Sequence, residues 1–320
     1  MMNFHWIRLA AADSGMAKLA RKFTTQVLFF IMAVMVAQSP VLADEAANTT
    51  DPLDLIKARG KVVIGVEKDI PLWGYQEART GELSGMEIDL AHALAKQLGV
   101  TAELVGIRSF ERIEALQTGR VDVLIAALSD SLERRQQVKM IQPHYYSSGV
   151  NLLARKSEKF KDWKELKNRR VCGRLSSFYN RPITVTYGAD IVAFHSLDWA
   201  LRAVRDGRCS ALVYDSTVII SLLQQPEWGE GFEMPMPSLY DVPWAVAIDY
   251  RNAGSELEHK IASVIIGWHR DGYFVDVERA WGIPASAFVR DMHAVWNKKK
   301  SDDSWYCGTE IFATTPLECL

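Results

Sequence analysis

Two serines and an arginine follow an apolar run near the middle of the chain. The run from Val121 to Ile125 has the length and β-branching of a buried strand, and Ser129, Ser131 and Arg134 come soon after it. In open α/β sheets, ligands bind outside the carboxyl ends of the strands. Hydroxyls, free N–H groups at a helix start and a guanidinium at such a place can hold a small carboxylate. This stretch therefore predicts a receptor for an anionic group.

The elements that must position these side chains alternate between strand and helix. Before the receptor stretch we expect strands at 61–66 and 101–105 and helices at 86–98 and 109–118. After it, the same pattern predicts strands at 171–175, 190–194 and 209–214, with a helix at 197–205. Such β-α-β-α-β runs are typical of parallel, doubly wound sheets. Two apolar strands, 145–154 and 242–248, are expected to cross between the two halves.

Several segments resemble those of a known family. ALSDSLERRQQV resembles the carboxylate-binding turn of periplasmic amino-acid-binding proteins, the solute receptors of polar amino-acid ABC transporters. TGELSGMEIDLAHALAKQLGV and LQTGRVDVLIA precede it in the family's order, and WKELKNRRVCGRLSS, GRCSALVYD and RDGYFVDVERAWG follow. The resemblance covers roughly residues 55 to 290.

The resemblance implies a two-lobed periplasmic-binding-protein fold of the α/β class. Each lobe would be a doubly wound, mainly parallel sheet, and two crossing strands would form the hinge. Lobe one is expected to comprise residues 44–147 plus 245–320, and lobe two residues 148–244. The alternative is a single rigid α/β domain.

The resemblance assigns ligand-binding roles to the receptor stretch. Arg134 would hold the α-carboxylate, and its alternative is a solvated surface arginine like Arg135. Ser129 and Ser131 would meet the carboxylate and amino groups, or cap the following helix, or do both. Asp130 departs from the family, which usually has an apolar residue there, and it would repel a carboxylate unless it points away.

Other predicted ligand contacts lie in both halves. By resemblance, Asp215 would pair with the ligand ammonium, which its place at a strand end favours, and the alternative is that it caps the next helix. Ser177 and the backbone N–H of Phe178 match the turn of lobe two, but without the family's usual residues. Glu67 ends the first strand and would face the ligand amine or a basic side chain, or be a solvated turn carboxylate. Trp73 would wall the pocket or belong to the core.

The N-terminus has the features of a signal peptide. Basic residues precede the apolar run 27–36, and the small residues before Asp44 suit cleavage, so residues 1–43 would direct export to the periplasm. Met16 is a second possible start. The run is short for a spanning helix, but a retained membrane anchor is the alternative.

Export allows disulfides, and four cysteines allow three pairings. We favour Cys172 with Cys209, because both lie at the start of expected neighbouring strands. Cys307 and Cys319 would then pair in the tail or stay free. A buried free thiol is the alternative for Cys172.

Charge and motifs exclude several function classes. The net charge of −2 gives no basic face for nucleic acid, and we find no nucleophile elbow, zinc-protease motif or phosphate loop. We therefore expect no enzyme activity, cofactor or metal site. The favoured function is a monomeric, exported solute-binding protein that captures a polar amino acid by hinge closure and delivers it to an ABC transporter permease. Alternatives are an exported dehydratase of the cyclohexadienyl type, a receptor-kinase sensor domain and a ligand-free periplasmic accessory protein.

Overall fold

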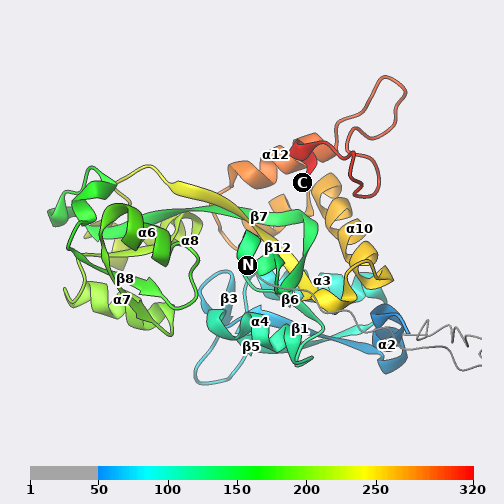
Figure 1. Cartoon of the computed structure of the whole chain (residues 1–320), viewed down its shortest axis with the longest axis horizontal. Coiled ribbons are helices and arrows are strands. Elements are labelled where there is room, and N and C mark those ends of the chain that lie inside the picture. The colour runs from blue at the N-terminus through cyan, green and yellow to red at the C-terminus, as the bar shows by residue number, and fades with distance from the viewer. Residues whose placement is uncertain (1–49) are drawn as a thin grey trace, which may run out of the picture. The chain divides into compact units, whose positions relative to one another are not determined.

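Most strands of the chain share one large sheet. The computed structural model describes residues 50–320, and the predicted signal peptide lies outside them. Within the described residues, nine strands form a sheet whose path is β5-β1-β6-β12-β7-β10-β8-β9, with β11 (Phe232–Glu233) beside β7. Figure 1 shows helices around this sheet at both ends. A smaller sheet consists of β2 (Asp69–Ile70), β3 (Gly74–Gln76) and β4 (Leu83–Ser84).

The first lobe is built on three parallel strands. β1 (Lys61–Glu67) lies between β5 (Thr101–Ile107) and β6 (Val123–Ile125) and pairs in parallel with both. The predicted helix 86–98 is confirmed as α3 (Met86–Leu98), which buries its leucines and ends where Gly99 adopts a φ of 77°. The other helices of this region are α2 (Pro52–Arg59), α4 (Arg112–Gln117) and α5 (Leu132–Arg135).

The second lobe repeats the parallel arrangement. β8 (Arg170–Arg174) pairs in parallel with β9 (Asp190–Phe194) and with β10 (Ala211–Asp215). Its helices are α6 (Asn180–Tyr187), α7 (Leu197–Arg205), α8 (Ser216–Leu223) and α9 (Pro226–Gly229). A disulfide joins Cys172 in β8 to Cys209, which stands just before β10, with their Cα atoms 5.6 Å apart. This is the pairing that the sequence favours.

Two long antiparallel strands join the lobes. β7 (Val138–Arg155) and β12 (Leu239–Asp249) pair from Val138 opposite Asp249 to Val150 opposite Leu239. β7 begins earlier than the predicted 145 because its first residues pair with the end of β12, inside the sheet of the first lobe. The two strands therefore turn two separate parallel sheets into one continuous sheet (Figure 1).

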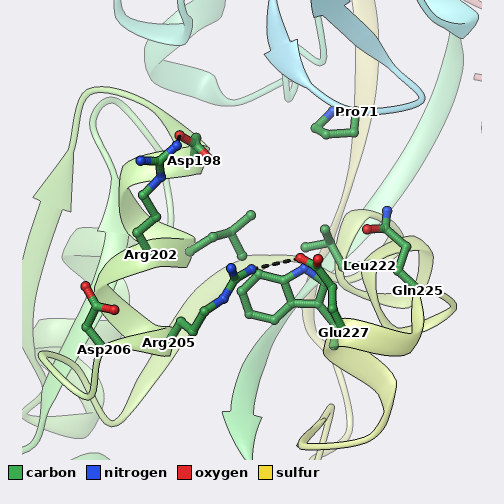
Figure 2. Close-up of a pocket in the computed structure, with 10 residues that line it drawn as sticks. Pro71, Asp198, Arg202, Arg205, Asp206, Leu222, Gln225 and Glu227 are labelled. Carbon is green, nitrogen blue, oxygen red and sulfur yellow. Dashed lines mark hydrogen bonds and ion pairs between the residues drawn. The ribbon is translucent and has the colours of Figure 1, made fainter.

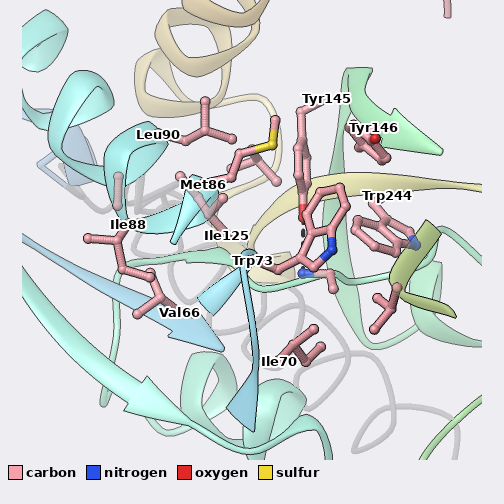
Figure 3. Packing of buried hydrophobic residues seen from close by; sticks show 14 of the residues in the cluster. Val66, Ile70, Trp73, Met86, Ile88, Leu90, Ile125, Tyr145, Tyr146 and Trp244 are labelled. Atoms are coloured by element: carbon pink, nitrogen blue, oxygen red, sulfur yellow. Dashed lines mark hydrogen bonds between the residues drawn. The ribbon is translucent and has the colours of Figure 1, made fainter. Parts of the chain in front are cut away.

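Aromatic side chains pack where the crossing strands meet the first lobe. The rings of Trp73 and Trp244 lie edge to face at 5.0 Å between centroids, and Tyr146 contacts both of them. Figure 3 shows this group packed beside aliphatic side chains from β1 and α3. Trp73 is fully buried there. Its side chain belongs to the core and does not line a pocket, because the turn after β2 places it against β7 and β12.

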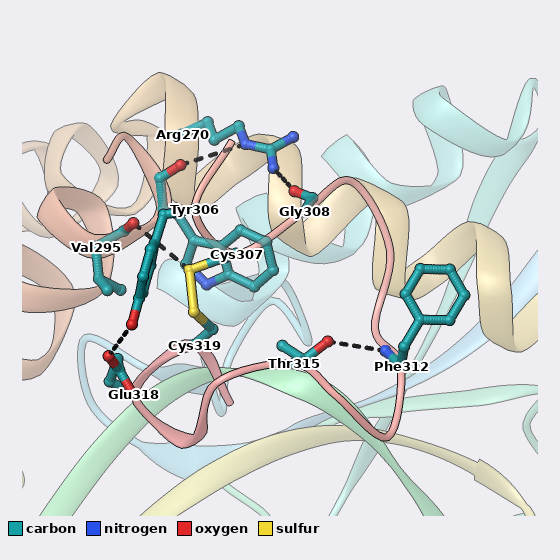
Figure 4. Close-up of a disulfide and its surroundings, with 10 residues drawn as sticks. Arg270, Val295, Tyr306, Cys307, Gly308, Phe312, Thr315, Glu318 and Cys319 are labelled. Carbon is teal, nitrogen blue, oxygen red and sulfur yellow. Dashed lines mark hydrogen bonds between the residues drawn. A yellow bond between two sulfur atoms is a disulfide. The ribbon is translucent and has the colours of Figure 1, made fainter. Parts of the chain in front are cut away.

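The C-terminal region packs against the first lobe. It contains α10 (Glu256–Asp271), α11 (Tyr273–Ala280) and α12 (Ala287–Trp296), followed by a tail that a second disulfide, Cys307–Cys319, closes into a loop. Figure 4 shows Arg270 of α10 bonded to the backbone oxygen of Gly308. The Arg270 guanidinium also lies over the ring of Trp305, 4.6 Å from its centroid. Along the part of the chain that the structure covers, no helix combines the length and the apolar character needed to cross a membrane.

Candidate functional site

The carboxyl ends of strands from both lobes meet around one small cavity. Glu67, Arg174 and Asp215 are the last residues of β1, β8 and β10. A cavity of about 20 Å³ lies beside them, and the described residues that line it come from both lobes: Ile70, Ser109, Arg112, Ala127, Ser129, Arg134, Arg174, Ser177, Phe178, Tyr179, Tyr214 and Asp215. Of the eight ligand-binding residues that the sequence predicts, five line this cavity.

Arg134 spans the two lobes at the cavity. Its Nη1 donates to the backbone oxygen of Ser129 at 2.9 Å, and its Nη2 donates to the backbone oxygen of Ser176 at 3.0 Å. Burial and the nearby Arg112 lower the pKa of Arg134 to about 9, which leaves the guanidinium charged at neutral pH. The side chain is buried, so it is not the solvated surface arginine of the alternative interpretation.

The two predicted serines have different positions. Ser129 is buried and lines the cavity, and its backbone forms an isolated antiparallel β-bridge with that of Trp244 in β12. The Ser131 side chain accepts a hydrogen bond from the backbone N–H of Arg134 at 3.3 Å and so caps α5. Ser131 is not among the residues that line the cavity, and its capping role fixes the start of the helix that carries Arg134.

Asp130 points away from the site. Its carboxylate accepts hydrogen bonds from Arg135, at 2.5 and 2.8 Å, and lies 2.7 Å from Nε2 of His144. Burial alone would raise the pKa of Asp130, but the bonds to His144 and Arg135 hold it below its usual value. The negative charge of Asp130 is therefore balanced by Arg135, and this carboxylate does not oppose an anion at Arg134.

Asp215 contributes the acidic side of the cavity. Its Oδ2 accepts a hydrogen bond from the Tyr179 hydroxyl at 3.1 Å. Its side chain therefore turns to Tyr179 rather than capping α8, as the alternative interpretation would have it. Burial raises the pKa of Asp215 to about 6, although the bond from Tyr179 and the surrounding arginines act in the opposite direction.

The turn after β8 supplies the remaining predicted contacts. Ser177 and Phe178 line the cavity, and the Phe178 ring packs edge to face on Tyr179 at 5.1 Å. Ser176 has a positive φ of 65°, a backbone conformation that residues other than glycine rarely adopt. This turn directs the Ser176 backbone oxygen toward Arg134.

Glu67 is at the site but does not line the cavity. It is fully buried, accepts a hydrogen bond from the Ser109 hydroxyl at 2.7 Å and pairs with Arg174 at 2.9 Å. Burial alone would raise the pKa of Glu67, but Arg174 and Arg112 hold it below its usual value. The carboxylate thus faces a basic side chain, as the sequence allowed, but that side chain belongs to the protein.

Arg112 is a cavity residue that the sequence analysis missed. Its Nη1 donates to the backbone oxygens of Ala126 and Ala127 at 2.7 and 2.8 Å, and its Nε donates to that of Ser109 at 2.9 Å. The predicted helix 109–118 is in fact a 3-10 turn, Ser109–Glu111, followed by the short α4, and the Ser109 hydroxyl donates to Glu67. The sequence signal that could have identified Arg112 is an arginine on the same helix face as the apolar Ala115 and Leu116.

A buried carboxyl group supports the turn beneath the cavity. Oε1 of Glu87 accepts hydrogen bonds from the Tyr145 hydroxyl at 2.6 Å and from the Ala127 backbone N–H at 2.7 Å. Burial raises the pKa of Glu87 to about 8. Ala127 lines the cavity and Glu87 does not, so the bond from the Ala127 N–H group to Glu87 ties the cavity lining to the buried core.

Larger hollows occur elsewhere in the described part of the chain. One of about 470 Å³ lies between α7, the α8–α9 region and Pro71 (Figure 2). There Arg205 pairs with Glu227 at 2.8 Å and lies over the Trp228 ring at 4.7 Å. These exposed charges satisfy one another and do not stand at strand ends, so the small cavity is the better candidate. In residues 50–320 no cluster of three or more His, Cys, Asp or Glu side chains could hold a metal ion.

Comparison with known proteins identifies the family of the chain. The sequence model of the family named bacterial extracellular solute-binding proteins, family 3, matches residues 62–284. The ABC transporter glutamine-binding protein of Bacillus subtilis (strain 168) is 25% identical over 261 residues, which are 79% of this chain and 93% of that protein.

Solved structures extend the match to the fold. An ancestral arginine-binding protein bound to glutamine has 29% identity and a TM-score of 0.63, covering 70% of this chain and 98% of that one. An ancestral amino acid-binding protein described as a precursor of cyclohexadienyl dehydratase has 26% identity and a TM-score of 0.64, covering 72% and 99%. Because the family model spans most of the chain, the protein belongs to the bacterial extracellular solute-binding proteins of family 3, whose matching relatives are amino-acid-binding proteins of ABC transporters.

Proposed function

We propose that this protein is a periplasmic receptor that captures a polar amino acid and delivers it to the membrane permease of an ABC transporter. The observation that carries this proposal is the convergence of Arg134 and Ser129 with Asp215 at one cavity. A guanidinium suits the α-carboxylate of a zwitterion, and a carboxylate suits its α-ammonium group. The matching relative that is named a glutamine-binding protein supports the ligand class.

The mechanism that we propose is closure about a hinge. Lobe one would comprise residues 44–147 plus 245–320, lobe two residues 148–244, and β7 with β12 would bend between them. Arg134 would exchange its bond to the Ser176 backbone for the ligand carboxylate, and closure would bring Asp215 to the ammonium. Because ligand contacts from both lobes exist only when they are close together, binding stabilises the closed form, which the permease would recognise.

Other parts of the proposal follow from the sequence. Residues 1–43 would direct export and be removed before Asp44. The mature protein would act as a monomer, without a cofactor and without enzymatic activity.

Thermal unfolding of the mature protein with a panel of amino acids tests the proposal. A ligand at about 100 times its dissociation constant adds about 2.7 kcal/mol to the free energy of unfolding, which raises the melting temperature by several degrees. We expect such a rise with one chemical group of amino acids. An unchanged melting temperature across the whole panel would contradict the amino-acid receptor.

A dehydratase of the cyclohexadienyl type is a second candidate. Asp215 lines the cavity, and its pKa of about 6 would let it act as a general acid. One structural relative is described as a precursor of such an enzyme. Incubation with prephenate and with arogenate, followed by product detection, distinguishes the two functions, since a receptor binds its ligand without converting it.

A further inference from the structure

An arginine of the second lobe is bonded to two acidic side chains of the first lobe. Arg174, at the end of β8, is only 1% exposed, and its Nη2 donates to Oε2 of Glu67 at 2.9 Å and also pairs with Asp69. Its Nη1 donates to the Tyr214 hydroxyl at 3.1 Å. The guanidinium is therefore held by three side chains from two lobes.

The acidic pair is already neutralised by the protein itself. Glu67 also accepts the Ser109 hydroxyl at 2.7 Å, and Arg112 lies 3.5 Å from its Oε1. A ligand with a cationic side chain could reach Glu67 and Asp69 only by displacing Arg174. That exchange would leave a buried arginine without its partners, and an uncompensated buried charge is strongly unfavourable.

The cavity lining favours the opposite kind of side chain. Of the described residues that line it, three are arginines (Arg112, Arg134 and Arg174) and one is acidic (Asp215). If Arg134 and Asp215 hold the α-carboxylate and α-ammonium, two guanidinium groups remain for the rest of the ligand. Glu67 and Asp69 balance most of this positive charge, but a guanidinium carries donors only, so these two side chains offer no acceptor to a second ammonium or a guanidinium on the ligand.

Arg174 also keeps one buried N–H donor. The Nε of Arg174 is buried and has no hydrogen-bond partner among the described residues, while Arg174 itself lines the cavity. A buried donor without a partner is costly, and an oxygen acceptor on the ligand would remove that cost. Arginine has only donors, so an oxygen acceptor on a ligand in the cavity would suit this N–H group, and a further donor would not.

We propose that the ligand is an amino acid whose side chain ends in a carbonyl or carboxylate oxygen, and that Arg174 excludes lysine and arginine by occupying Glu67 and Asp69. This inference rests on the proposed receptor function and names the substrate class of the same site. The guanidinium of Arg174 occupies the position beside Glu67 and Asp69 that a cationic side chain of a ligand would need. Its remaining N–H donor then suits a ligand side chain that carries an acceptor.

Calorimetric titration of the wild-type protein with L-glutamine, L-glutamate, L-lysine and L-arginine is the first test. We expect glutamine or glutamate to bind at least 100-fold more tightly than either cationic amino acid. Binding of lysine or arginine as tight as that of the amide and the acid would overturn the role of Arg174 and leave the receptor function intact. If none of the four, nor any other amino acid, bound, the receptor function itself would fall, and the inference with it.

The variant Arg174→Met is the second test, because it removes the charge and keeps an unbranched apolar stem. We expect lysine and arginine to bind this variant at least 10-fold more tightly than they bind the wild type, and glutamine or glutamate to bind less tightly. The triple variant Glu67→Gln, Asp69→Asn, Arg174→Met is the matched control, since it lacks the acidic pair and should gain no affinity for cations. A folded Arg174→Met protein without the gain would contradict the proposal. If that variant fails to fold, the wild-type selectivity decides the question.

Discussion

Arg134 and Ser176 form a hydrogen bond of 3.0 Å between the two lobes, from a guanidinium on α5 to a backbone oxygen in the turn after β8. The same guanidinium also donates to the Ser129 backbone oxygen. Both acceptors are uncharged carbonyl groups, so Arg134 retains a full positive charge that no carboxylate within residues 50–320 contacts directly. A carboxylate ligand would be a stronger acceptor than either carbonyl, since charge-assisted bonds are about twice as strong as neutral ones.

Replacing Arg134 by alanine should abolish tight binding of the amino acid while keeping the fold. Loss of two hydrogen bonds to a charged group costs about 3 kcal/mol or more, which corresponds to at least roughly 100-fold in affinity. Titration calorimetry measures the affinity, and circular dichroism checks the fold. Arg135→Ala is the matched control, because Arg135 is on the same helix but pairs with Asp130 outside the cavity. Equal affinity of Arg134→Ala and the wild type would remove Arg134 from the site.

Binding should weaken in mild acid because of Asp215. Its pKa of about 6 means that the carboxyl group gains a proton and loses its charge as the pH falls below 6. The ligand ammonium then loses its partner, so affinity should decrease by up to about 10-fold for each pH unit below 6. Asp69, whose pKa burial also raises to about 6, adds to the decrease by loosening Arg174.

Titrations between pH 5 and 8 test this dependence with two variants. Asp215→Asn should bind weakly at every pH, with a smaller decrease in acid than the wild type shows. Asp198→Asn is the control, because Asp198 is exposed on α7 and pairs with Arg202 at 3.0 Å, away from the small cavity. A wild-type affinity that is constant from pH 5 to 8 would argue against an ionised Asp215 as the ammonium partner.

Glu87 should make the protein less stable as the pH rises toward 8. Its folded pKa of about 8 exceeds the ordinary value of 4.5, so the folded state binds more protons than the unfolded state between these values. The free energy of unfolding therefore decreases with pH in this window, by roughly 3 kcal/mol between pH 4.5 and pH 7.

The variant Glu87→Gln isolates this contribution because it is neutral at every pH. Its amide oxygen can still accept from Tyr145 and Ala127, so we expect higher stability than the wild type at pH 8 and little difference at pH 4.5. Urea unfolding at several pH values measures both proteins. The exposed Glu82→Gln substitution should leave the wild-type pH dependence unchanged. A parallel pH dependence in Glu87→Gln and wild type would mean that Glu87 is ionised in the folded protein.

The two disulfides should differ in what their removal affects. The Cys172–Cys209 pair closes 37 residues and joins β8 to the segment just before β10, so serine at both positions should cost about 4 kcal/mol. The Cys307–Cys319 pair closes 12 residues of the tail, and its loss should cost about 3 kcal/mol at most. We expect the tail variant to keep its ligand affinity within about 3-fold. Denaturant unfolding and titration of both double variants check this, and a loss of binding in the tail variant would link the tail to the site.

The local part of the fold could be predicted because its signals are local. The leucine spacing and Gly99 set α3, and the residues 190–194 and 197–205 form the expected strand and helix. The strand order also placed Asp215 at the end of β10 and Arg134 in the segment after β6, and both residues line the cavity. Near the C-terminus no periodic pattern exists, so the tail could not be placed until its disulfide and its contacts with α10 were known.

By itself, the sequence determined the α/β class, the order of the elements and the residues at the strand ends, because hydrophobic period and glycine stops act over a few residues. Only the tertiary structure decided which charges meet. Glu67 and Arg174 are 107 residues apart in sequence and pair at 2.9 Å. Whether a strand turns Arg174 inward, and whether a 3-10 turn carries Arg112 to the cavity, depends on packing between elements. Coulomb interactions depend on distance in space, and sequence spacing does not set that distance across two lobes.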